Sequence, residues 1–244
     1  MSYTLRRPAG ATAAAPHEAI AAAIAGRGFT LALQPVVGVT TRVPDHAEVL
    51  LRLPAPLTQS PRAFVAAADA AGLGPALDAA VLAMARGVAG PVSVNVCARS
   101  LQQQGFVRTV LDAGVPGIEL VRIDAIDDLA AIVAALAELR AAGVRVALDE
   151  VDGGAASLAL MQAARFDALK LSGAVVRAAM AGPRGRTLLA ELLRLAAAIG
   201  ARSIATRIET LPQLWAMQRA GVELAQGWLL GAPAARVPAA PPPG

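Results

Sequence analysis

Oxygen-bearing side chains recur in and just after short apolar segments of this 244-residue chain. They belong to Glu48, Asn95, Glu119 and the adjacent pair Asp149 and Glu150. A carboxylate in a buried strand is destabilising unless it is paired or binds a cation. A ligand set made only of oxygens suits Mg²⁺, Mn²⁺ or Ca²⁺ rather than zinc. Any one of these residues alone would be an ordinary buried or solvent-facing polar group, but their recurrence indicates a site for a hard cation.

Two further apolar segments carry a lysine and a glutamine. Lys170 lies within Ala168–Leu171, and Gln226 lies within Leu224–Trp228. A lysine among carboxylates can be a simple ion-pair partner, or it can orient or deprotonate a nucleophilic water. The residue types leave both roles open.

The elements that must position these side chains alternate along the chain between strand-like and helix-like segments. About eight strands separated by helices predict an α/β fold, a (β/α)8-like TIM-type barrel, with an open doubly wound sheet as the alternative. In such a barrel the active site lies at the carboxyl ends of the strands. The predicted strands are Thr30–Val37, Ala47–Leu53, Pro91–Cys97, Gly117–Ile123, Val144–Asp149, Ala168–Leu171, Arg202–Ala205 and Leu224–Trp228.

Capping signals mark several helices. One predicted helix begins at a Ser-Pro pair, and the others end just before a glycine. These helices are Pro61–Ala71, Asp127–Ala142, Thr187–Ala198 and Leu211–Ala220. Residues 1–15 are predicted to be flexible, residues 16–233 to form one barrel domain, and residues 234–244 to be a disordered Pro/Ala-rich tail.

Composition excludes several classes of function. A net charge of +4 with 3% aromatic residues does not favour binding of a nucleic acid polymer. The single cysteine, Cys97, permits no disulfide within the chain, and we expect it to be a small buried residue. The two histidines, His17 and His46, follow no metal-ligand spacing. The sequence shows neither a secretory leader pattern nor an apolar run long enough to span a membrane, so we expect a cytoplasmic protein.

The same residues carry a resemblance to the EAL domain family over roughly residues 29–233. No single motif is specific, but eight segments that resemble family motifs occur in the family's order. They are Phe29–Val37, Ala47–Arg52, Ser60–Phe64, Ser93–Val96, Val146–Glu150, Asp167–Lys170, Ile204–Thr210 and Gln226–Pro233. The resemblance implies a barrel that hydrolyses cyclic di-GMP to linear pGpG with divalent cations.

The resemblance also implies roles for individual residues. Glu48, Asn95, Glu119 and Asp149 would hold a first cation. The catalytic group would comprise Lys170, Glu150 and Glu209, and the ligand would be contacted by Arg52, Gln34 and Gln226. Arg52 would contact a phosphate, because an arginine fork suits that group.

Departures from the family's motifs fall around the second cation. Thr206 stands where the resemblance implies a glutamate, and Arg207 where it implies a glycine. Arg122 replaces a glutamate, and Glu150–Gly154 replaces the loop Asp-Phe-Gly-Thr-Gly. A neutral hydroxyl is a poor ligand for a hard cation. We therefore expect one Mg²⁺, Mn²⁺ or Ca²⁺ at most, with a second metal unfavoured.

Three functions are compatible with this pattern. The first is a degenerate EAL domain that binds cyclic di-GMP or a protein partner with little or no hydrolysis. The second is a weak metal-dependent phosphodiesterase that produces pGpG. The third is a protein-interaction module with a vestigial pocket. A homodimer is compatible with each of them, because EAL domains often pair through their barrels.

Overall fold

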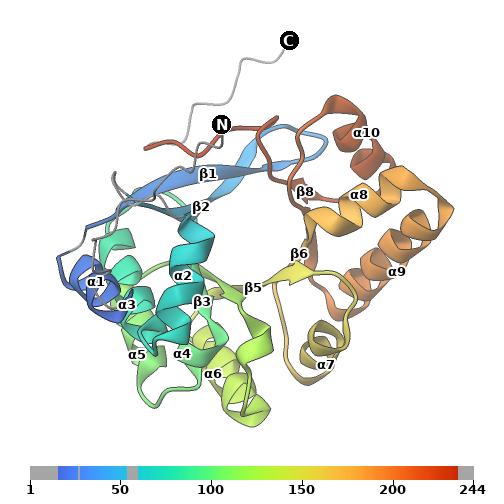
Figure 1. The fold of residues 1–244 in the computed structure, drawn as a ribbon. Helices are drawn as coiled ribbons and strands as arrows, with labels where there is room; N and C mark the ends of the chain where they lie inside the picture. Colours follow the sequence, from blue (N-terminus) through green and yellow to red (C-terminus); the bar gives the residue numbers. More distant parts are fainter. Residues whose placement is uncertain (1–15, 27, 54–59, 236–244) are drawn as a thin grey trace, which may run out of the picture.

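Eight strands of the computed structural model close into a barrel in the order β1 to β8 (Figure 1). The structure describes residues 16–26, 28–53 and 60–235. The closed barrel confirms the predicted fold class. The strands are β1 (Thr30–Gly38), β2 (Pro44–Arg52), β3 (Val92–Cys97), β4 (Gly117–Val121), β5 (Arg145–Val151), β6 (Ala168–Leu171), β7 (Arg202–Ala205) and β8 (Leu224–Ala225).

One strand runs against the others. β1 pairs antiparallel with both β2 and β8, while the neighbouring strands from β2 to β8 are parallel. Only residues 39–43 link β1 to β2. A parallel crossover needs a dozen or more residues, so this link can only form a hairpin. The first strand thus departs from the parallel direction of the other strands in this barrel.

Helices pack around the outside of the barrel (Figure 1). The predicted start is present, because the Ser60 side chain caps the helix that begins at Pro61. The structure adds a capping box formed by Thr210 and Gln213. Gly200 and Gly221 end two helices in the left-handed conformation. The helices are α1 (Pro16–Ala25), α2 (Pro61–Ala70), α3 (Gly74–Ala85), α4 (Ala98–Leu101), α5 (Phe106–Ala113), α6 (Leu129–Ala141), α7 (Ala155–Ala163), α8 (Gly173–Ala181), α9 (Pro183–Ile199) and α10 (Leu211–Ala220), with a 3-10 turn at Ile123–Ala125.

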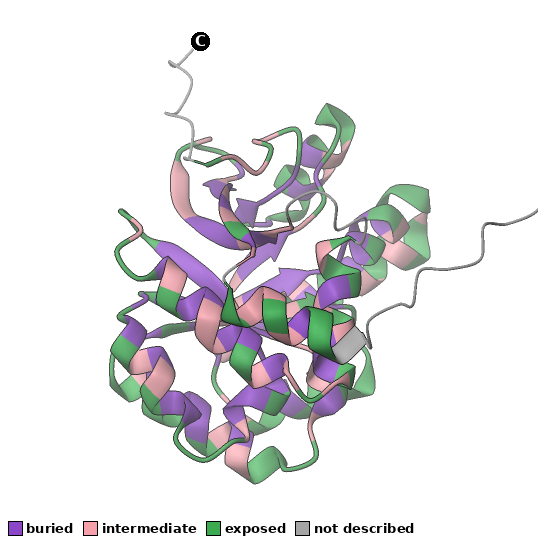
Figure 2. Ribbon diagram, turned by 60° about the vertical axis from the view of Figure 1, so that its left-hand side comes forward, coloured by how far each residue is buried: buried purple, intermediate pink, exposed green. Residues whose placement is uncertain are grey.

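The core is built mainly from aliphatic side chains. The buried residues lie on the strands and along one side of the helices (Figure 2). All four phenylalanines are buried, and so is Cys97, as expected. Lys170 is among the largest fully buried side chains. A buried ammonium needs carboxylate partners, so its surroundings locate the charged site of the barrel.

The described chain ends slightly beyond the predicted domain. Ala234 exchanges backbone hydrogen bonds with Leu33 of β1, at 2.7 and 3.0 Å, so the paired backbone reaches past residue 233. The predicted flexible N-terminus, residues 1–15, and most of the predicted tail, residues 236–244, lie outside the described residues. Within the described ranges, the helices are all too short or too polar to cross a membrane.

Candidate functional site

Three carboxylates from three strands surround the Lys170 ammonium inside the barrel. Lys170 Nζ donates to Glu48 Oε2 at 2.8 Å and to Glu119 Oε2, and it lies 3.8 Å from Asp149 Oδ1. The exposed fraction is 7% for Glu48, 0% for Glu119 and 2% for Lys170. The structure thus brings together four residues that the sequence placed on β2, β4, β5 and β6.

Neutral side chains complete the hydrogen bonding of the carboxylates. Gln226 Nε2 and Asn95 Nδ2 donate to the two oxygens of Glu48, each at 2.7 Å. Ser93 Oγ donates to Glu119 Oε1, also at 2.7 Å. Gln34 accepts a longer bond of 3.4 Å from Gln226. Gln226 is therefore a buried support of Glu48, and Gln34 in turn holds Gln226.

Burial and mutual charge shift the pKa values within this cluster. Burial, with Glu48 and Asp149 nearby, raises the pKa of Glu119 to about 8 in spite of Lys170. Burial also raises the pKa of Asp149. Burial acts to raise the pKa of Glu48 too, but the charge of Lys170 and hydrogen bonds from Lys170, Asn95 and Gln226 hold that pKa below the ordinary value. The three carboxylates overcome the effect of burial on Lys170 and raise its pKa, so it stays an ammonium at neutral pH.

One oxygen beside the cluster is suited to a cation. Asn95 Oδ1 is buried and has no hydrogen-bond partner, whereas the other such oxygen in the described ranges, on Asp69, lies 3.3 Å from Arg99 Nε. A buried amide oxygen without a partner next to a carboxylate suits a hard cation. However, the Lys170 ammonium takes the central position, and the described residues contain no three His, Cys, Asp or Glu side chains arranged as a metal site. Asn95 Oδ1 is thus the open oxygen donor beside the cluster, and the binding of one cation there stays a prediction.

Thr206 stands where the resemblance implies a carboxylate ligand of a second cation. Thr206 Oγ1 donates to the carbonyl oxygen of Leu171 at 2.9 Å, so its hydroxyl is committed to the backbone of the neighbouring strand. Glu150, beside Asp149, is exposed. This donor set does not fit a second hard cation.

A cavity of about 870 Å³ opens above the cluster at the carboxyl ends of the strands. Glu48, Asn95 and Asp149 contribute to its floor, whereas Lys170 and Glu119 lie beneath the lining. Its walls also carry four arginines: Arg52, Arg62, Arg122 and Arg207. An acidic floor beneath guanidinium groups can hold an anionic ligand at its rim.

Three of the lining residues adopt left-handed backbone. Arg122, Glu150 and Arg207 have φ values of 55°, 53° and 57°. Each follows or ends a strand at the cavity rim, and non-glycine residues adopt this conformation at a cost of about 1–2 kcal/mol. Such strain is concentrated at functional sites, and here it fixes where these side chains leave the backbone.

One predicted catalytic residue lies away from the cluster. Glu209 is exposed just before α10 and is not part of the cavity lining. Its backbone nitrogen donates to Gln213 Oε1 at 2.8 Å. The structure therefore shows Glu209 beside a helix cap, and its catalytic role stays a prediction.

Two buried aspartates beside the cavity were not singled out from the sequence. Asp78 of α3 accepts hydrogen bonds from Ser100 Oγ at 2.6 Å and from the Cys97 backbone nitrogen at 2.8 Å. Asp69 lies 3.1 Å from a guanidinium nitrogen of Arg122. An aspartate within the otherwise apolar helix Gly74–Ala85 was the available signal. Asp78 ties α3 to the end of β3.

Asp78 is expected to make the protein less stable as pH rises from about 4 to about 6. Burial raises the pKa of Asp78 to about 6, from 3.8, against the hydrogen bonds from Ser100 and Cys97. The folded state therefore holds a proton that the unfolded state loses first, and stability falls through this window by on the order of 2 kcal/mol. Urea unfolding at pH 4.5, 5.5 and 6.5 should show that Asp78→Asn makes the fall in stability shallower, while Asp112→Asn, at an exposed position, leaves it unchanged. An unchanged slope in Asp78→Asn would refute the assignment.

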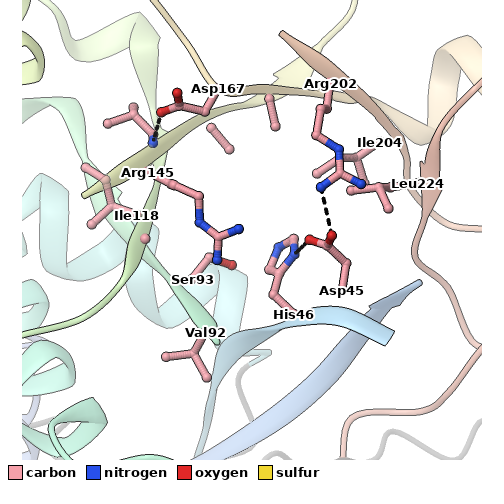
Figure 3. A pocket seen from close by; sticks show the side chains of 14 residues that line it. Asp45, His46, Val92, Ser93, Ile118, Arg145, Asp167, Arg202, Ile204 and Leu224 are labelled. Atoms are coloured by element: carbon pink, nitrogen blue, oxygen red, sulfur yellow. Dashed lines mark hydrogen bonds and ion pairs between the residues drawn. The ribbon is translucent and has the colours of Figure 1, made fainter. Parts of the chain in front are cut away.

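The opposite end of the barrel has a smaller pocket of about 100 Å³ (Figure 3). Its charged groups are largely matched to one another. Asp45 accepts from Arg202 at 2.7 Å and contacts His46 at 2.9 Å, and Asp167 accepts from the backbone nitrogen of Val146 at 2.8 Å. Burial lowers the pKa of His46 despite Asp45. The charged groups at this end of the barrel therefore have a structural role, and the larger cavity is the candidate functional site.

Comparison with known proteins gives matches over most of the chain. The sequence profile described as "EAL domain" matches residues 17–233. The chain is 26% identical over 225 residues to cyclic di-GMP phosphodiesterase PA2567 of Pseudomonas aeruginosa, covering 84% of this chain and 38% of that protein. It is 25% identical over 234 residues to cyclic di-GMP phosphodiesterase PdeB of Shewanella oneidensis, covering 88% and 27%. The chain thus spans less than two fifths of the length of these relatives.

A solved structure shows the same fold. The FimX EAL domain from Pseudomonas aeruginosa, bound to c-di-GMP, superposes with a TM-score of 0.78 at 22% identity. The match covers 90% of this chain and 97% of that one. The likeness extends over nearly the whole barrel.

Proposed function

The chain belongs to the EAL domain family, and on that premise we propose that it binds cyclic di-GMP in the 870 Å³ cavity with little or no hydrolysis. Relatives named as cyclic di-GMP phosphodiesterases support the ligand. The observation that carries the loss of hydrolysis is the Thr206 hydroxyl, which donates to the Leu171 carbonyl where the family resemblance implies a carboxylate. One cation at most then fits beside Asn95.

The residues of the cluster and of the cavity wall would have different roles in binding the ligand. Glu48, Asn95, Glu119 and Asp149 would hold one divalent cation, which supplies Lewis-acid polarisation of a phosphoryl oxygen when it is bound. Lys170 holds positive charge on the floor of the site, because its pKa is raised by three carboxylates. Arg52 lines the cavity and donates one bond to Leu51 O at 2.8 Å, and its remaining N–H groups would contact a phosphate of the ligand. Binding of cyclic di-GMP would thus require fewer of the family's site residues than its hydrolysis requires.

Isothermal titration of the protein with cyclic di-GMP tests the proposal. Titrations in Mg²⁺, Ca²⁺ and EDTA, followed by chromatography of the same samples for pGpG, separate binding from turnover. The expected result is saturable binding without pGpG. Binding accompanied by pGpG would make the protein a slow enzyme. If cyclic di-GMP binds under none of these conditions, the proposal is wrong and a protein-interaction module, alone or as a homodimer, is the better account.

A weak phosphodiesterase is the second candidate, and a specific observation supports it. Asn95 Oδ1 is open to a cation, and the Lys170 ammonium lies 3.8 Å from Asp149. These groups belong to the first cation position, which the departures in sequence leave intact. Removing one metal from a two-metal site should nevertheless lower the rate by orders of magnitude. Formation of pGpG that depends on Mn²⁺ and is abolished by Asp149→Asn would favour this candidate.

A further inference from the structure

Arg207 stands at the cavity rim on the side of the missing second cation. It follows Thr206 at the end of β7, and it lines the same cavity as Asp149 and Glu150. Its φ of 57° belongs to the left-handed region, which side-chain-bearing residues rarely adopt. The position of its side chain is thus imposed by the surrounding fold and not by local preference.

The aliphatic part of the Arg207 side chain passes close to the backbone of Gly173. A Cβ atom placed on Gly173, the first residue of α8, would lie 2.4 Å from Arg207 Cδ and 3.0 Å from Cγ. Only glycine allows this approach. The side chain therefore runs across the start of α8, while the residue as a whole stays exposed.

The charge of Arg207 is not taken up by a carboxylate in the described part of the chain. Arg122, by contrast, lies 3.1 Å from Asp69 and 3.3 Å from Asp124. Lys170 is committed to the carboxylates on the floor. Arg52, Arg62 and Arg207 form no ion pair among the described residues, so Arg207 offers an unneutralised fork to the cavity that Asp149 also lines. Planar forks of this kind suit phosphate oxygens.

We infer that the Arg207 guanidinium binds a phosphodiester group of the ligand and supplies the positive charge that a second cation would otherwise bring. This inference rests on the proposed function. It makes ligand binding independent of divalent cations, and it assigns Arg207 a role in binding and none in hydrolysis. Gly173 is its positioning residue.

Titration calorimetry in EDTA tests the inference with matched variants. Wild-type protein should bind cyclic di-GMP in EDTA, and Arg207→Gly should weaken binding by about 10- to 100-fold, the worth of a hydrogen bond to a charged group. Arg86→Ala, which removes an exposed arginine outside the cavity, should change binding by less than about 2-fold. Arg207→Gly should fold, because glycine favours the left-handed conformation, and melting curves would check this.

A double-mutant cycle measures the coupling between Gly173 and Arg207 in ligand binding, which a general loss of positive charge would not produce. Gly173→Ala should displace the Arg207 stem and weaken binding in the wild-type background, but it should have no further effect in Arg207→Gly. Additive effects would overturn the positional part of the inference. Wild-type binding that requires a divalent cation, or that survives Arg207→Gly in EDTA, would overturn the role of Arg207 and leave the proposed function standing. Absence of binding in every condition would refute both.

Discussion

Lys170→Met is expected to lower the free energy of unfolding by about 3–5 kcal/mol at pH 8, which is the cost of leaving buried charges without their partner. Lys170 Nζ contacts carboxylates of Glu48, Glu119 and Asp149, of which two are almost fully buried. Methionine fills a similar volume, so the loss reports charge and not a cavity. Urea unfolding of the two proteins measures it.

The pH dependence of that loss distinguishes its cause. The folded-state pKa of Lys170 is above the ordinary value, so its stabilising contribution is fully present at neutral pH and fades only as pH rises through that pKa. Without the ammonium, the buried carboxylates bind protons more tightly in the folded state. The destabilisation by Lys170→Met should therefore shrink as pH falls from 8 to 5, and adding Glu119→Gln should recover part of it. An equal loss at both pH values would point to packing instead.

The buried site at position 170 favours lysine over arginine. Lys170 is the only lysine of the chain, whose other 21 basic residues are arginines. An ammonium is compact and directs three donors tetrahedrally, whereas a guanidinium is planar and larger. The pocket around a side chain that is 2% exposed leaves no room for the difference. Lys170→Arg should therefore also destabilise the protein, by about 1–3 kcal/mol through overpacking, while retaining the charge.

The barrel and its charged cluster were predictable because few placements satisfy them. A carboxylate or an ammonium within an apolar strand must face the inside of a barrel with a partner, and strand alternation sets which residues do so. Parallel pairing in register then places Asn95 directly opposite Glu119. The contact of Glu48 with Lys170, 122 residues apart, follows from closure of the barrel.

Other features depend on geometry that residue types do not reveal. The reversed direction of β1 is decided by the five-residue link after Gly38, which the alternating pattern concealed. The predicted last strand ends early, at Ala225. Beyond it the chain leaves the sheet, and Gly227 passes so close to Ile208 that a Cβ on residue 227 would lie 2.1 Å from the Ile208 carbonyl oxygen. The left-handed backbone at Arg207 has no local sequence signal in an arginine. Its direction toward the cavity could be learned only from the assembled barrel.

The Thr206→Glu, Arg207→Gly double variant is expected to gain phosphodiesterase activity. Glutamate at position 206 would extend past the Leu171 carbonyl that now holds the threonine hydroxyl, and it would add a carboxylate on the Asp149 side of the cavity. Glycine at 207 would remove the guanidinium without backbone strain, and a second cation held by the glutamate at position 206 would then supply the positive charge that Arg207 supplies in the wild type. We expect formation of pGpG in Mn²⁺ to rise at least about 100-fold over wild type, or about 2.7 kcal/mol of barrier.

The neutral isostere separates charge from shape in this experiment. Thr206→Gln, Arg207→Gly has the same bulk and the same lost arginine but no carboxylate, so its turnover should stay at the wild-type level. A gain in both variants would mean that Arg207 alone suppresses hydrolysis. No gain in a glutamate variant that folds and binds cyclic di-GMP would shift the cause to the segment after Asp149, where Glu150 is left-handed and Gly154 is held to Asp152 by a 2.8 Å hydrogen bond. Each result assigns the loss of hydrolysis to the end of one strand, because the segment after Asp149 follows β5 and the pair Thr206 and Arg207 follows β7.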